Sequence, residues 1–159
     1  MSNSTGDAAW TLADLHHLGI TVSDIERSIS FYRDTLGMEL IRRRPEVAAD
    51  YVAQQTGYVG VELSVASFRV SPGSRQSLEV VQYLNHAGAP SDQATNRPGN
   101  THLCLLVDDL RACYAELNEK NVRFKSDPVT ITSGPNSGGV VVYFFDPDGY
   151  TLELFQPPT

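Results

Sequence analysis

The 159-residue chain is 41% hydrophobic and 19% charged, which is typical of one soluble globular domain with a sizeable core. Its formal net charge of −7 argues against nucleic-acid and anionic-membrane partners, because both select basic surfaces. No stretch of about 18 apolar residues is present, so no membrane-spanning segment is predicted.

The N-terminal residues and the cysteines indicate a cytoplasmic protein. Residues 1–10 are small and polar, without the basic start and apolar core of a signal peptide, and we expect a disordered tail. Cys104 and Cys113 lack the spacing of a metal-binding pair, and we expect two buried thiols. Residues 11–159 are then expected to form a single domain.

The first half of the chain, at about 15–84, is predicted to run strand, helix and three strands. After a strand at 15–22, Ser23 is expected to cap the helix, with Glu26 completing a capping box. Gly37 is expected to end the helix in a left-handed conformation. The helix has one apolar stripe, formed by Ile25, Ile29, Tyr32 and Leu36. The later strands are expected at 38–42, 61–70 and 77–83.

The second half, at about 100–157, repeats this order. Asp108 is expected to cap a helix that ends at Asn121. The sequence Asp146-Pro147-Asp148-Gly149 lies between two apolar segments and predicts the turn of a hairpin. The helical stripe consists of Leu110, Cys113, Tyr114 and Leu117. The later strands are expected to begin at 122–124 and to cover 140–145 and 150–155.

Three segments and one basic run fall outside the repeat. An insertion at 45–60 is expected to hold a short helix near 47–55, and a link at 84–99 joins the halves. The glycine-rich segment 131–139 is either a lid opposite the insertion or a plain surface loop. The run Arg42-Arg43-Arg44 is either a solvated strand edge or a patch that holds a phosphate or carboxylate of a substrate.

The two halves begin with the same pattern. Residues 17–25 align with residues 102–110, so that His, Leu, Val and Asp recur at matching steps. Each half later has one glutamate inside an apolar strand. The duplication predicts a two-fold metal site with two nitrogen and two oxygen ligands: His17, Glu79, His102 and Glu153.

The apolar neighbours of each glutamate strengthen this prediction. An isolated buried carboxylate costs several kcal/mol, and a shared divalent cation would offset that cost. A single strand histidine or glutamate is more often hydrogen-bonded or solvent-facing, so the prediction depends on the repeated set. Strand alternation places three further side chains on the ligand faces, and these are the candidate substrate-binding residues: Thr21, Tyr83 and Phe155.

Over about 15–157 the chain resembles the vicinal oxygen chelate superfamily, which includes glyoxalase I, methylmalonyl-CoA epimerase, extradiol dioxygenases and bleomycin-resistance proteins. The motifs that carry the resemblance are His17 with Asp24, Ser28-Ile29-Ser30-Phe31-Tyr32, Leu36-Gly37-Met38, His102 with Val107-Asp108-Asp109, and Asp146-Pro147-Asp148-Gly149-Tyr150-Thr151-Leu152-Glu153. It implies an α+β fold, in which two paired βαβββ modules form an open, curled mixed-sheet barrel around a divalent metal. It also implies a homodimer.

The four-ligand set is similar to that of glyoxalase I. It implies a metal-dependent lyase or isomerase that moves a proton next to a carbonyl of a small oxygenated substrate, free or thioester-linked. Either Glu79 or Glu153 would be the catalytic base. Thr21 and Tyr83 stand where glyoxalase I usually has an arginine and an asparagine, which argues against glutathione as the substrate.

Two other functions stay open. An extradiol-type dioxygenase would hold a non-haem iron with His17, His102 and Glu153, leaving Glu79 unbound. A resistance-type protein would bind a small molecule without catalysis, although such proteins often lack the metal residues that this chain has. The cation could be nickel, cobalt, zinc, manganese or iron, since each accepts mixed nitrogen and oxygen ligands.

Overall fold

The computed structural model describes residues 9–159, so most of the expected tail at 1–10 lies outside the described residues. In half one (residues 15–84) the elements are β1 (His17–Thr21), α1 (Ile25–Ile29), the π-helical η1 (Ser30–Thr35), β2 (Glu39–Val47), α2 (Asp50–Thr56), β3 (Leu63–Arg69) and β4 (Ser77–Tyr83). In half two (residues 100–157) they are β5 (Leu103–Leu106), α3 (Leu110–Glu119), β6 (Val129–Thr130), β7 (Val140–Phe145) and β8 (Thr151–Gln156).

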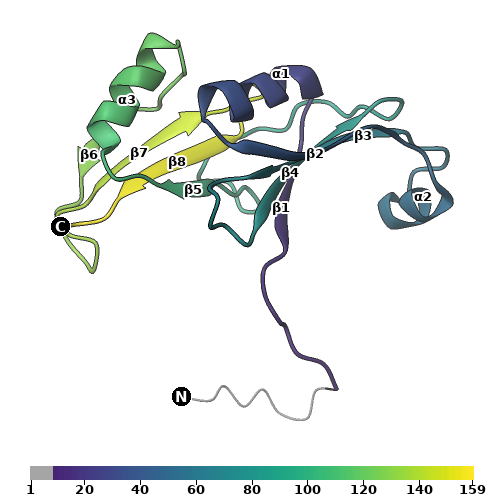
Figure 1. Cartoon of the computed structure of the whole chain (residues 1–159), viewed down its shortest axis with the longest axis horizontal. Coiled ribbons are helices and arrows are strands. Elements are labelled where there is room, and N and C mark those ends of the chain that lie inside the picture. The colour runs from purple at the N-terminus through teal and green to yellow at the C-terminus, as the bar shows by residue number, and fades with distance from the viewer. Residues whose placement is uncertain (1–8) are drawn as a thin grey trace.

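Each half forms one open, four-stranded mixed sheet, with strand orders β1-β4-β3-β2 and β5-β8-β7-β6. The first strand of each half runs parallel to the last, and the other neighbours are antiparallel. Figure 1 shows the two sheets side by side, with α1 and α3 on the same side of them and α2 at the far end of half one. The α+β fold of two βαβββ modules is confirmed, as open sheets rather than a closed barrel.

One hydrophobic core joins the halves, on the side of the sheets that α1 and α3 cover. Phe68 lies opposite Leu78 in half one, and Phe144 lies opposite Leu152 in half two. All four side chains are at most 1% exposed. Even-numbered residues of β3, β4, β7 and β8 therefore face the core, and the odd-numbered residues of these strands face the open side.

Both helix caps differ by one residue from the expectation. Asp24, not Ser23, is the N-cap of α1, and its carboxylate accepts hydrogen bonds from two backbone N–H groups of the first turn. Asp109, not Asp108, caps α3 in the same way, accepting from the N–H of Ala112. At each helix start, the expected and the observed residue are both of a type that caps helices. The second of the two begins the helix at the position where the apolar stripe faces the core. Gly37 and Asn121 have the expected left-handed conformation.

One further expectation on half two is wrong, and of the two alternatives for the 131–139 segment the structure favours the plain surface loop. The segment at 122–124 contributes only one isolated bridge, at Phe124, and β6 begins later at Val129. Pro128 has no N–H to give to a ladder, so pairing resumes only after it. The 131–139 segment is a loop on half two, closed by backbone hydrogen bonds between Ile131 and residues 138 and 139, and Figure 1 places α2 of the insertion at the other end of the molecule. It therefore does not lie opposite the insertion as a lid.

The turn between β7 and β8 connects half two to half one. Tyr32 donates a hydrogen bond to Oδ2 of buried Asp146 at 3.1 Å. The Asp148 carboxylate accepts from the backbone N–H and hydroxyl of Ser23, and pairs with Arg27 at 2.5 Å. We call these five side chains the joint. Within residues 9–159, no helix has the length and apolar character needed to cross a membrane.

Candidate metal and substrate site

Each half places its histidine and its glutamate together on the open side of the sheet. Gly19 lies opposite Glu79, and Cys104 lies opposite Glu153, so each histidine is two residues before the position that faces its glutamate. In half one, Nε2 of His17 lies 3.8 Å from Oε2 of Glu79. In half two, Nε2 of His102 lies 2.8 Å from Oε2 of Glu153. The duplicated sequence thus gives two His–Glu pairs with related geometry.

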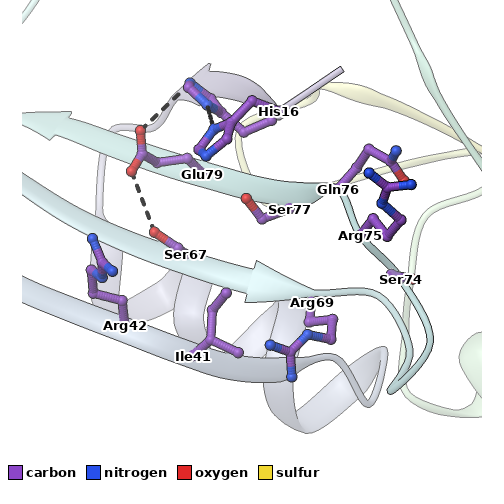
Figure 2. Close-up of a pocket in the computed structure, with 11 residues that line it drawn as sticks. His16, Ile41, Arg42, Ser67, Arg69, Ser74, Arg75, Gln76, Ser77 and Glu79 are labelled. Carbon is purple, nitrogen blue, oxygen red and sulfur yellow. Dashed lines mark hydrogen bonds and ion pairs between the residues drawn. The ribbon is translucent and has the colours of Figure 1, made fainter. Parts of the chain in front are cut away.

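The pair in half one has a polar surround. Oε1 of Glu79 accepts a hydrogen bond from the Ser67 hydroxyl at 3.3 Å and lies 3.5 Å from Nη2 of Arg44. Nδ1 of His17 lies 2.8 Å from Nδ1 of His16. His16 precedes β1, which begins only at His17, so strand alternation does not restrict the direction of its side chain. Figure 2 shows His16, Ser67 and Glu79 around the same groove.

The pair in half two has a less polar surround. Tyr143, which occupies the position equivalent to Ser67, stacks edge-on against His102 with ring centroids 5.2 Å apart. Cys104 is exposed rather than buried as expected, and Cys113 is half-buried. Partial desolvation of the Cys104 thiol raises its pKa to about 11, and the negative charge of Glu153 adds to the shift. Burial and the same carboxylate also raise the pKa of Tyr143. Glu153 is only 16% exposed. The charge of Glu153 is therefore stabilised mainly by His102, whereas the charge of Glu79 also has Ser67 and Arg44 beside it.

Two hollows lie on half one, and His17 and Glu79 line both. One is a polar groove of about 460 Å³ that extends toward the β3–β4 turn, and the other is a pocket of about 290 Å³ beneath α2. Thr21 and Tyr83 line the pocket beneath α2, so two of the three predicted substrate-binding residues lie with the first ligand pair. Phe155 lies on β8 of half two, two residues after Glu153, and is not among the residues that line this pocket.

The arginine run divides between the two faces of β2. Arg43 reaches the helix side, where Nη2 lies 2.8 Å from Oε1 of Glu26. Arg42 and Arg44 lie on the open side, among the residues that line the groove and the pocket respectively. Leu40 faces the core, and residues 42 and 44 would share its face in a regular strand. A bulge between Leu40 and Arg42 moves them to the open side instead. Sequence periodicity does not reveal such a bulge, so the sequence left the run open between a solvated edge and an anion-holding patch and could not separate Arg43 from Arg42 and Arg44.

The donor set fits a divalent metal, but one chain does not assemble it. Among residues 9–159, no group of three or more His, Cys, Asp or Glu side chains is close enough to hold a metal ion. The chain instead presents two half-sites, each with one imidazole and one carboxylate. Two nitrogens and two oxygens suit a first-row divalent cation. The residues therefore fit the ion if a His17–Glu79 pair and a His102–Glu153 pair face one another.

Comparisons with known proteins identify the family of the chain. A 2-epi-5-epi-valiolone epimerase from Actinomyces sp is 32% identical over 152 residues, which are 91% of this chain and 79% of that protein. The lactoylglutathione lyase of Salmonella typhimurium is 31% identical over 144 residues, covering 89% of this chain and 91% of the enzyme. A glyoxalase family protein from Bacillus cereus has the same fold, with a TM-score of 0.82 at 17% identity over 97% of this chain and all of that one. The family model for the glyoxalase/bleomycin resistance protein/dioxygenase superfamily matches residues 14–154. The chain belongs to this superfamily.

Proposed function

We propose that the chain is a divalent-metal-dependent enzyme that moves a proton next to a carbonyl group of a small oxygenated substrate. The observation that carries the proposal is the pair of His–Glu contacts at equivalent positions of the two halves. Each contact combines an imidazole nitrogen, which can coordinate a metal, with a carboxylate that can hold a cation or accept a proton. The relatives named as an epimerase and as a lactoylglutathione lyase support this class of reaction.

The active form that we propose is a homodimer. In it, the His17–Glu79 pair of one protomer would face the partner's His102 and the partner's Glu153. The separation of the two pairs within one chain supports this arrangement, because each pair offers only two ligands and no group of three or more metal-binding side chains comes together among residues 9–159. Leu106 lies on the open side of half two, two residues after Cys104, and is 71% exposed. Such a dimer would cover this side chain.

The four ligand candidates would have different tasks. A bound cation would supply a Lewis acid for the substrate's oxygen atoms. Glu79 is the stronger candidate base because it lines both hollows and lies farther from its histidine than Glu153 does. Ser67 and Arg44 hold its Oε1 atom, which orients Oε2 toward His17. Glu79 would take the proton from the carbon next to the carbonyl and return it to the neighbouring carbon or to the opposite face.

The pocket beneath α2 would hold the less polar part of the substrate. Val52 of α2, with Val65 and Val81 of the sheet, makes its wall, whereas Thr21 and Tyr83 supply hydroxyl groups. Such a mixed lining excludes water from the reacting carbon and still leaves two hydrogen-bonding groups for orientation. Thr21 and Tyr83 would therefore affect the choice of substrate more than the binding of the metal.

Metal analysis of the untagged wild-type protein and of His102→Ala tests the site. We expect about one divalent ion per chain in the wild type and a loss of affinity of at least 100-fold in the variant, beyond the range typical of outer-shell partners. His86→Ala is the matched control, because His86 lies in the link and contacts the Val59 carbonyl and the Tyr58 ring rather than a ligand candidate. Wild-type protein that binds no metal even after reconstitution would overturn the proposal.

A mixture of His17→Ala and His102→Ala chains tests the dimer. If each site takes one pair from each protomer, a mixed dimer has one intact site and one site lacking both histidines. Random pairing then restores about one quarter of the wild-type metal capacity, since half of the dimers are mixed. If both pairs of a site came from one chain, mixing would restore none. The two variants are refolded together, so that slow exchange between dimers does not hide the effect.

A second function has one specific observation in its favour. Glu79 already has Ser67 and Arg44 as partners, so a site could form from His17, His102 and Glu153 alone, as a non-haem iron dioxygenase requires. In that case Glu79→Gln would keep its metal, the metal would be iron, and turnover would consume oxygen. For the proton-transfer enzyme, the same variant would lose activity under air and under nitrogen alike.

A further inference from the structure

We propose that the polar groove beside His17 and Glu79 is an anion subsite, which binds a phosphate or carboxylate group of the substrate through Arg42, Arg69 and Arg75. This inference rests on the proposed function and deepens it, because it assigns a negatively charged group to the substrate. We call this hollow the arginine groove. It is defined by the three arginines with Ser67, Gln76 and Ser77 between them.

The register of the sheet places the groove directly beside the candidate metal ligands. Arg42 lies opposite Ser67, and Ser67 lies opposite Glu79, so these side chains form one row across three strands. Arg69 lies opposite Ser77 in the next row of the same face. An anion held between the rows would place the next few atoms of the same molecule over Glu79. The groove is therefore part of the path to the ligands rather than a separate surface.

Arg42 is the free cation of the groove. It makes no hydrogen bond and no ion pair with any residue from 9 to 159, although its side chain lines the groove. The other two arginines of the run already have carboxylate partners, since Arg43 pairs with Glu26 and Arg44 with Glu79. A guanidinium that faces a hollow without a carboxylate partner is suited to bidentate binding of phosphate or carboxylate.

The other two arginines have partners that an anion could replace. Nη1 of Arg69 lies 2.7 Å from Glu39, and Nη2 of Arg75 lies 3.2 Å from Asp14. These carboxylates are 56% and 45% exposed, so water screens both ion pairs and each contributes little. The Ser77 hydroxyl adds a neutral donor, and the Gln76 amide, which donates to Asp14 at 3.4 Å, has a second N–H. In a chain with a net charge of −7, this concentration of donors favours an anion at one place.

Titration calorimetry with inorganic phosphate tests the subsite on the full-length protein. We expect saturable binding by the wild type, a loss of about tenfold or more in Arg42→Gln, and a smaller loss in Arg69→Gln, because a charge-assisted contact is removed. Arg111→Gln is the matched control, since it removes the same charge from the exposed surface of α3 and should bind phosphate as the wild type does. Malonate, titrated in the same way, separates the two chemistries: the tighter ligand identifies the substrate's group as phosphate or carboxylate.

Two measurements separate this inference from the proposed function. The titrations are repeated on protein that has been stripped of metal with EDTA and then dialysed free of it, because EDTA is a polycarboxylate that would compete for the groove. After this treatment phosphate bound to a metal would be lost and phosphate bound to the arginines would stay. Metal content of Arg42→Gln should equal that of the wild type, as no candidate ligand is changed. Equal weakening in Arg42→Gln and Arg111→Gln, or binding that EDTA abolishes, would overturn the anion subsite and leave the metal site standing. Absence of metal from a wild type that still binds phosphate at Arg42 would refute the proposed function instead.

Discussion

Half one and half two have matching frameworks and different surroundings for their His–Glu pairs. Phe68 and Phe144 occupy equivalent core positions, and the two glutamates occupy equivalent positions on the open side. Around Glu79, however, there are two arginines, a serine and the added helix α2, whereas Tyr143 and Cys104 surround Glu153. The duplicated framework positions the donor atoms, and the insertion with its neighbouring strand gives half one the features that suit substrate binding.

The core prediction has the largest expected effect and tests whether the matching frameworks form one folding unit. We expect Phe68→Ala and Phe144→Ala each to lower the free energy of unfolding by about 3–5 kcal/mol, because each removes a fully buried ring from the shared core. Urea unfolding followed by circular dichroism measures both, with Val59→Ala, at a 92% exposed position, as the control. Two separate transitions in either variant would show that the halves unfold independently.

A smaller effect is expected at α2, which only half one possesses. Val52 is 3% exposed and packs in a small cluster with Val61, Leu63 and Val65, apart from the main core. Val52→Ala should cost about 1–2 kcal/mol, because it removes two buried methyl groups. Hydrogen exchange should accelerate in α2 and β3 and stay unchanged in half two. Faster exchange in both sheets would mean that α2 supports the whole fold rather than the pocket alone.

The asymmetry of charge around the two carboxylates predicts a change in metal affinity. The Arg44 guanidinium lies beside Glu79, and a fixed positive charge disfavours a second cation nearby. Arg44→Gln should therefore bind metal several-fold more tightly, by at most about tenfold or 1.4 kcal/mol. Arg43→Gln, the adjacent position on the opposite face, is the control. Competition with a chelator measures the affinities, and equal changes in both variants would point to net charge alone.

The smallest effect concerns the joint and depends on pH. Burial raises the pKa of Asp146 above its value in the unfolded chain, so this group stabilises the fold most when it is protonated. Its contribution is fully present below about pH 3.9 and is lost as the pH rises through the folded-state value. Asp146→Asn does not titrate, so the stability of the wild type relative to the variant should fall with rising pH, by at most about 1.4 kcal/mol per unit. Urea unfolding of both proteins at several pH values measures this. A difference in the free energy of unfolding that stayed constant or grew with rising pH would contradict the prediction.

The sequence predicted what local patterns determine. Alternation and turn chemistry located β3, β4, β7 and β8 closely, and the repeat located both His–Glu pairs. The caps were missed by one residue because two adjacent side chains could each serve. The arginine run stayed open between a solvated edge and an anion-holding patch, because a bulge that the sequence does not reveal decides which of its side chains face the site. The meeting of the two pairs depends on contacts between distant segments or between chains, which no local pattern encodes.

The joint has a consequence for the rate at which the molecule comes apart. Its contacts link Tyr32 with Asp146, 114 positions apart, and Ser23 and Arg27 with Asp148, more than 120 apart. Closing such long loops costs entropy that is recovered only when both sheets are already formed. We expect these contacts to be absent from the folding transition state, so that weakening them with Tyr32→Phe accelerates unfolding and leaves the folding rate nearly unchanged. The lifetime of the native molecule would then be set at the turn that connects its two halves.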